Sequence, residues 1–346
     1  MKKKIGPKLY IYYLMSDTRQ NMDQVNIQVQ RKALILGFVL FGLKLTAYLI
    51  TNSNAILTDA LEGLVNILGA GLGLFSLYYA TLPRDENHPY GHGKIEFISS
   101  GFEGALIGIA GAGMIFKAIY AFFYPEEVTI NTLSLGLIVF AGIVNYAMGY
   151  SMVQQGRKVN SIQLEAGGKH LISDGYTTAG LVVGLGVVWI TGIDALDNVL
   201  AIILGLIISV TGYKIIRKSI AGVMDEADEE YLEKMAKILE DKRREAWVDI
   251  HNIRMVRYGA KIHLDAHLTL PWYYILKDSH DEVNHLDSIL EEVFDGNIET
   301  SVHTEPCRKD LCRICNLTDC KERKEAFECR DVWTVKHLLN YKHEEV

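Results

Sequence analysis

Six long apolar segments constrain the fold of this chain more than any other feature of its sequence. They cover residues 33–51, 55–82, 98–123, 133–153, 170–191 and 194–216. The hydrocarbon core of a bilayer is about 30 Å thick, so a helix needs roughly 20 mostly apolar residues to cross it, and each segment approaches that length. We therefore expect a membrane domain, an all-α six-helix transmembrane bundle over residues 33–218, preceded by a separate segment at residues 1–32.

Positive charge indicates how these helices cross the membrane. Lys and Arg occur near both ends of the bundle and in the loops after the second and fourth segments, for example at Arg84, Lys94, Arg157 and Lys158. The three loops on the other side contain neither residue type. Because loops rich in Lys and Arg stay in the cytoplasm, we expect both termini to be cytoplasmic.

The last third of the chain has the composition of a soluble domain. Residues 1–224 contain 17 Lys and Arg against 14 Asp and Glu, a net +3. Residues 225–346 contain 18 against 28, a net −10, and this polar tail holds the mean hydropathy of the whole chain to +0.11. The acidic balance and the absence of a basic stripe argue against a nucleic-acid partner.

The hydrophobic periodicity changes in this tail and predicts an α-β-β-α-β order of elements. We expect a helix over 225–245, strands over 248–257 and 260–269, a helix over 277–294 and a strand over 297–304. This order predicts a small α/β domain over residues 219–306. Residues 307–346 show little apolar periodicity, and we expect a Cys-rich extension that cannot form a core of its own.

Polar side chains inside the expected spans mark a candidate site. Asp59, Glu62 and Asn66 are three and four residues apart, and His170 and Asp174 are four apart, so each set shares one helix face. Such side chains are costly in a bilayer unless they are partnered, and they indicate function by default. Mixed nitrogen and oxygen ligands suit Zn²⁺ or a similar divalent metal. The alternative is that they only hydrogen-bond neighbouring helices.

Among the other charged side chains within the expected spans, two need an explanation. These are Lys44 in the first segment and Glu103 in the third. Each needs a partner in the bilayer, and we interpret both as members of structural ion pairs.

Three stretches of sequence together resemble the cation diffusion facilitator family. They are NAILTDALEGLVN at 54–66, PRDENHPYGHGKIE at 83–96 and HLISD at 170–174, and the resemblance extends over the six segments and the tail to about residue 306. It implies a secondary active transporter rather than an enzyme, a homodimer in a bacterial-type inner or plasma membrane. The implied activity is proton-coupled export of Zn²⁺, or of Fe²⁺, Co²⁺, Cd²⁺ or Mn²⁺, from the cytoplasm by alternating access.

The resemblance also implies a transport site made by pairs from the second and fifth spans. Carried over to this chain, the pairs are Glu62 with Asn66 and His170 with Asp174. The usual second-span pair in the family is His/Asp or Asp/Asp, so the neutral Asn66 is a departure that leaves ligand number and metal preference open, and Asp59 is a further candidate ligand. His170 resembles the zinc-type members.

A metal site in the loop between the second and third spans is implied as well. Asp85, His88 and His92 are spaced for a common turn, which Pro89 and Gly91 favour. They resemble the intracellular-loop site of the family. The alternative is that the two histidines only pack the loop.

The resemblance implies a third metal site at the dimer interface of the tail, on a metallochaperone-like or ferredoxin-like α/β domain. The residues at or near matching positions are His251, His263, His280, His303 and Glu305. We interpret His267, His285, His337 and His343 as ordinary surface residues. Metal bound at this interface would offset the repulsion between two acidic tails and bring them together.

All five cysteines lie in the extension and depart from the family pattern. They are Cys307, Cys312, Cys315, Cys320 and Cys329. In a reducing cytoplasm such a cluster binds metal more often than it forms disulfides. Four thiolates suit structural Zn²⁺, and the C-x₄-C-x₂-C portion also matches a plant-type iron–sulfur spacing. Structural zinc, an iron–sulfur or sensing role and free thiols all remain open.

Two other classes of function compete with transport. A membrane-anchored metal sensor or scaffold without transport is consistent with the unusual pair Glu62 and Asn66. A membrane metalloenzyme is the third possibility, but the sequence contains no HExxH motif and no nucleophile elbow.

Overall fold

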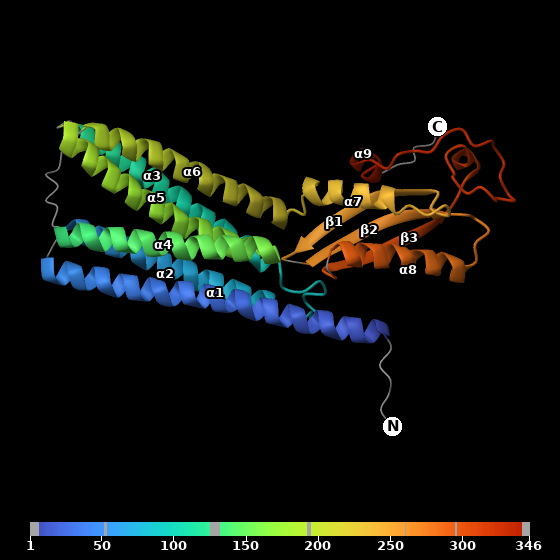
Figure 1. Ribbon diagram of the computed structural model, residues 1–346, viewed down its shortest axis with the longest axis horizontal. Coiled ribbons are helices and arrows are strands. Elements are labelled where there is room, and N and C mark those ends of the chain that lie inside the picture. Colours follow the sequence, from blue (N-terminus) through green and yellow to red (C-terminus); the bar gives the residue numbers. More distant parts are fainter. Residues whose placement is uncertain are drawn as a thin grey trace, which may run out of the picture. The chain divides into compact units, whose positions relative to one another are not determined.

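The structure is a computed structural model that describes residues 7–51, 54–124, 132–191, 195–259, 261–294 and 296–340. Contacts along the chain divide it into two compact units, Met1–Met224 and Asp225–Val346. Figure 1 shows a helical first unit and a second unit that contains a small sheet.

The described part of the first unit contains six long helices. They run alongside one another (Figure 1). They are α1 (Pro7–Thr51), α2 (Asn54–Ala80), α3 (Ile95–Phe123), α4 (Thr132–Val159), α5 (Ile162–Thr191) and α6 (Ala195–Val223). Each overlaps a predicted apolar segment, but α1 begins 26 residues before the predicted start. Residues 8–36 contain neither Gly nor Pro, so nothing in the chain ends the helix there.

Three helices in the described residues are long and apolar enough to cross a membrane. They cover Ile95–Phe123, Gly136–Val159 and Asn198–Val223, and Asn66–Ala80 is a shorter apolar helix. This supports an integral membrane protein, while the full number of six spans stays a prediction.

Small residues let the helices of this unit pack backbone to backbone. A Cβ atom added at Gly111 of α3 would lie 2.7 Å from the carbonyl oxygen of Gly205 in α6, and one added at Gly149 of α4 would lie 2.6 Å from that of Gly168 in α5. Such close approach is typical of helices in lipid, where burial of apolar surface does not drive association. The α4–α5 contact fixes the helix that carries two of the predicted site residues.

The second unit has the predicted order of elements. They are α7 (Glu229–Asp241), β1 (Asp249–Tyr258), β2 (Lys261–Leu270), α8 (Leu276–Val293) and β3 (Ile298–Pro306). The sheet order is β1-β2-β3, with β1 antiparallel and β3 parallel to β2, so α8 makes the crossover between the two parallel strands. The small α/β domain with a three-stranded sheet is therefore confirmed.

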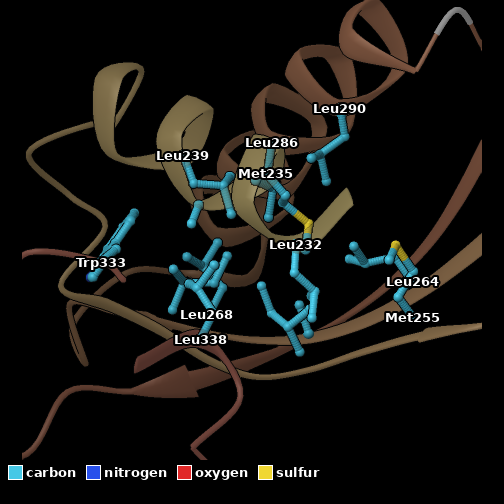
Figure 2. Close-up of a cluster of buried hydrophobic side chains, with 14 of the residues drawn as sticks. Leu232, Met235, Leu239, Met255, Leu264, Leu268, Leu286, Leu290, Trp333 and Leu338 are labelled. Atoms are coloured by element: carbon cyan, nitrogen blue, oxygen red, sulfur yellow. The ribbon is translucent and has the colours of Figure 1, made fainter. Parts of the chain in front are cut away.

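The core of the second unit lies between the two helices and one face of the sheet. Figure 2 shows Leu232 and Leu239 of α7 and Leu286 of α8 directed toward Leu264 and Leu268 of β2. All five side chains are buried. Because side chains alternate along a strand, the five odd-numbered residues of β2, all of them polar or charged, lie on the opposite face.

The extension after β3 packs into this same core. Trp333 is 2% exposed and lies under the guanidinium of Arg243, which is 3.9 Å from the ring centroid. Leu338, in the short helix α9 (Val335–Leu338), is fully buried beside it (Figure 2). The prediction that the extension forms no core of its own is wrong, because Leu311 and Cys315 are buried with Val248 in a small apolar cluster separate from the main core. The packing of its end onto α7 and β1 was not predicted from its polar composition.

Candidate functional site

Three predicted side chains from two helices converge in the first unit. Nε2 of His170 lies 2.7 Å from Oδ1 of Asn66, and Nδ2 of Asn66 donates a hydrogen bond of 2.6 Å to Oδ2 of Asp174. His170 and Asp174 are one turn apart on α5 and therefore face α2 together. A single amide thus links the imidazole and the carboxylate across the α2–α5 contact.

The hydrogen-bond directions in this cluster define the state of His170. An amide oxygen only accepts hydrogen bonds, so Nε2 carries the hydrogen in this arrangement. The other ring nitrogen, Nδ1, is buried and has no hydrogen-bond partner among the described residues. A metal ion bound at Nε2 would move this hydrogen to Nδ1 or release it, because only the deprotonated nitrogen is a ligand.

The remaining predicted ligands of this site are Asp59 and Glu62. Both lie on α2, and their side chains fall outside the described residues. Their part in the site stays a prediction.

A cavity of about 30 Å³ connects this cluster with further polar side chains. Asn66 and His170 line it together with Gln30, Lys44 and Glu103. Sequence reasoning missed Gln30, because it placed this residue in the segment before the bundle. In the structure, α1 instead places Gln30 inside the bundle, where this residue is buried. Its Nε2 donates a hydrogen bond of 3.0 Å to the carbonyl oxygen of Ala70.

Glu103 of α3 is the most deeply buried carboxylate on this cavity. It is 2% exposed, and its Oε1 accepts a hydrogen bond of 3.5 Å from Nε2 of Gln163. Its Oε2 has no hydrogen-bond partner among the described residues. A cation entering the cavity would therefore meet this carboxyl oxygen. Lys44 lines the same cavity, and the interpretation of both as members of structural ion pairs stays a prediction.

The loop between α2 and α3 brings its three predicted residues together. Oδ1 of Asp85 is 2.9 Å from Nδ1 of His88, and Oδ2 is 3.4 Å from Nε2 of His92. Three ligand atoms, one from each residue, lie within 4.8 Å of one another. Gly91 has a φ of +89°, a conformation that glycine adopts readily, and so supplies the turn. The group has the geometry of a candidate metal site.

The same contacts hold the carboxylate of Asp85 in its charged form. Desolvation alone would raise the pKa of Asp85. The backbone and ring hydrogen bonds from His88, with the charges of His88 and His92, outweigh it and lower the pKa. A ligand oxygen whose charged form is favoured in this way suits a cation site.

The polar face of the sheet carries another candidate metal site. Nδ1 of His267 lies 2.7 Å from Oε1 of Glu305, and Nε2 of His251 lies 3.6 Å from Oε2 of the same carboxylate. Ligand atoms of these three residues lie within 4.8 Å of one another. The interpretation of His267 as an ordinary surface residue is therefore wrong, since it belongs to the cluster. His303 lies beside it, with the two rings tilted and their centroids 5.0 Å apart.

A buried carboxylate orients this second cluster. Asp249 is fully buried and lies 2.9 Å from Nδ1 of His251 and 2.6 Å from Nε2 of His337. Its contact with Nδ1 leaves Nε2 of His251 facing Glu305. A carboxylate behind a ligating histidine is the usual outer partner of a metal site.

The other two histidines predicted for this site lie elsewhere in the single chain. His263 is near Asp265 and Glu299, with distances of 3.3 and 3.9 Å, and His280 is exposed on α8. The predicted site concerns two copies of the chain, so the part of these residues in it stays a prediction.

All five cysteines are free thiols. Burial raises the pKa of the Cys307 thiol, against a backbone hydrogen bond from Trp272 that lowers it. A metal bound there would have to displace protons.

Comparison with known proteins gives a family for both units. Residues 32–224 match the family described as the cation efflux transmembrane domain, and residues 227–307 match the cation efflux protein, cytoplasmic domain. The first match alone covers more than half of the chain.

Several relatives match over most of their length. An uncharacterized transporter of Synechocystis is 31% identical over 269 residues, which are 77% of this chain and 85% of the relative. The cation-efflux pump FieF of Shewanella oneidensis is 23% identical over 80% of this chain and 92% of its own. The manganese efflux system protein MneS of Bacillus subtilis is 24% identical over 78% of this chain and 91% of its own length.

Proposed function

Because the chain belongs to the cation efflux, or cation diffusion facilitator, family of metal transporters, we propose that it exports a divalent transition metal from the cytoplasm in exchange for protons. The observation that carries this proposal is the Asn66 amide held between His170 and Asp174, at 2.7 and 2.6 Å. An imidazole, a carboxylate and an amide oxygen from two packed helices are a ligand set for such a metal.

The chemistry of these side chains provides the coupling to protons. Metal binding needs an unprotonated nitrogen on His170 and an ionised Asp174, so each metal ion that binds displaces protons that were held there. Reprotonation from the other side of the membrane then releases the metal. An imidazole titrates near neutral pH, which suits repeated exchange.

The preference among metals follows from the ligand types. Zn²⁺ is favoured, because imidazole nitrogen suits Zn²⁺ more than it suits Mn²⁺. Fe²⁺, Co²⁺, Cd²⁺ and Mn²⁺ remain alternatives, since the neutral oxygen of Asn66 replaces a carboxylate.

The proposal includes six membrane spans, cytoplasmic termini and a homodimer that joins through the cytoplasmic domains. The polar face of the sheet supports the dimer, since the buried His251 and the partly exposed His267 and Glu305 form a group that a second copy could complete. Metal there would reduce the repulsion between two tails of net −10 each.

Vesicles that contain the purified protein and an internal metal-sensitive dye test this function. With an imposed pH gradient, we expect Zn²⁺ to enter with the wild type and with Asp241→Asn, which changes an exposed carboxylate on α7. Asp174→Asn should abolish the entry. Equal flux through both variants would refute the site.

The same vesicles separate transport from the competing function. Saturable Zn²⁺ binding without gradient-dependent flux in the wild type would instead indicate the membrane-anchored sensor or scaffold.

A further inference from the structure

Four of the five cysteines line one cavity at the end of the sheet. The cavity measures about 180 Å³ and is lined by Cys307, Cys312, Cys315 and Cys320, with Trp272 beside them. Cys329 is exposed and lies outside this lining. The structure thus separates four thiols that face a common space from one that does not.

The loop that carries these cysteines is held in place by the sheet and by one arginine. The backbone N–H of Cys307 donates to the carbonyl of Leu270, the last residue of β2, at 2.8 Å. The guanidinium of Arg323 donates to the backbone oxygens of Cys312 and Cys315 at 2.7 and 3.1 Å. Cys315 is 7% exposed and packs against buried apolar side chains. The thiols are therefore positioned before any ligand binds.

The separation of the thiols argues against a single metal ion. Four sulfurs about 2.3 Å from one tetrahedral Zn²⁺ lie about 3.8 Å apart. Among the described residues, the groups whose three ligand atoms all lie within 4.8 Å of one another include no cysteine. A single ion also needs no space beyond its ligands, whereas this cavity is many times the roughly 10–15 Å³ that a cavity needs, on the same measure, to hold one water.

An iron–sulfur cluster fits both the spacing and the space. Its thiolate ligands are divided among two or four iron atoms, so thiolates on different irons lie farther apart than the ligands of one ion. The run Cys307-x₄-Cys312-x₂-Cys315 has the spacing of plant-type ferredoxin ligands, and Cys320 supplies a fourth thiolate.

The charge around the cavity agrees with this ligand. Four cationic side chains and one carboxylate belong to its lining, namely Arg308, Lys309, Arg323, Lys324 and Glu322. The excess of positive charge offsets the negative charge of four thiolates. The hydroxyl of Tyr273 also lies 3.7 Å from Sγ of Cys320, and hydrogen bonds to the sulfurs are a regular feature of such sites.

We propose that Cys307, Cys312, Cys315 and Cys320 bind an iron–sulfur cluster in the cytoplasmic domain. The site is distinct from the transport site and does not depend on it. It gives the chain a prosthetic group whose assembly requires iron and sulfide rather than the transported ion alone.

The test is metal and sulfide analysis of the full-length protein. Protein purified without oxygen from iron-replete cells should contain iron and acid-labile sulfide in equal amounts, with a visible absorption that dithionite bleaches. Cys312→Ser should lose most of both. The matched variant Cys329→Ser should keep them, because its sulfur lies outside the cavity.

Several results would overturn the proposal. Stoichiometric zinc without sulfide would indicate a single-ion site, as would iron without sulfide, and equal loss in the two variants would refute the assignment of ligands. Anaerobic reconstitution of the wild type with iron and sulfide, beside a parallel sample with zinc alone, tests the site even if Cys312→Ser does not fold. Failure to bind iron and sulfide there would also contradict it.

Discussion

Asn66→Asp tests how the amide of Asn66 works between His170 and Asp174. The change keeps the size of the side chain but replaces a hydrogen-bond donor by a carboxylate, 2.6 Å from Oδ2 of Asp174. Two unit charges at that distance repel by about 6 kcal/mol at an effective dielectric constant of about 20. The variant avoids this cost by holding one proton between the two carboxylates, as paired carboxylates do.

Metal binding to this variant must displace the extra proton. We therefore expect the plot of log Kd for Zn²⁺ against pH to become steeper by about one unit of slope, with tighter binding than the wild type at high pH and weaker binding at low pH. Competition with a fluorescent chelator, in detergent and over a range of pH, measures the slope. Asn284→Asp on α8 makes the same chemical change elsewhere and should leave it unaltered. An unchanged slope in Asn66→Asp would refute the reasoning.

Three further changes test other parts of the structure. Gly149→Ala would place a Cβ atom 2.6 Å from the backbone oxygen of Gly168, which cannot move aside, so we expect a loss of about 1–3 kcal/mol of stability. The loss would appear as a lower midpoint of thermal unfolding in detergent, and an unchanged midpoint would contradict this packing. Asp249→Asn removes the carboxylate that contacts Nδ1 of His251 and should weaken Zn²⁺ binding at the cluster of His251, His267 and Glu305 by about 10- to 100-fold in a titration. Unchanged affinity would show that Asp249 does not orient His251. In metal-free protein the raised pKa of Cys307 lowers its thiolate fraction at neutral pH. Iodoacetamide should therefore modify Cys307 more slowly than the exposed Cys329, as followed by mass spectrometry. The reverse order would contradict the burial of Cys307.

Local patterns predicted the elements of the second unit closely. Each strand of the sheet begins within one residue of its predicted start, and α8 begins at Leu276, one residue before its prediction. Alternation and amphipathic spacing are local signals, which is why they sufficed here. Helical spacing also predicted that His170 and Asp174 share one face of α5, whereas the contact of that face with Asn66 of α2 was implied by the family resemblance.

Features that depend on tertiary contacts were not predictable in this way. The grouping of His267 with His251 depends on a register shift between His251 and Arg254, where Asn252 has a φ of +50°. No composition rule specifies such a bulge. In the sequence, Trp333 lies in a polar extension. It is buried because it packs against the core residues of α7 and the sheet.

The most direct test of the central claim is the movement of protons driven by metal alone. In vesicles with equal pH on both sides and a luminal pH dye, addition of external Zn²⁺ should make the lumen more alkaline as metal enters and protons leave. Asp174→Asn should abolish both signals, because the exchange requires this carboxylate. Metal entry without a change in luminal pH would contradict proton exchange at the site of Asn66, His170 and Asp174.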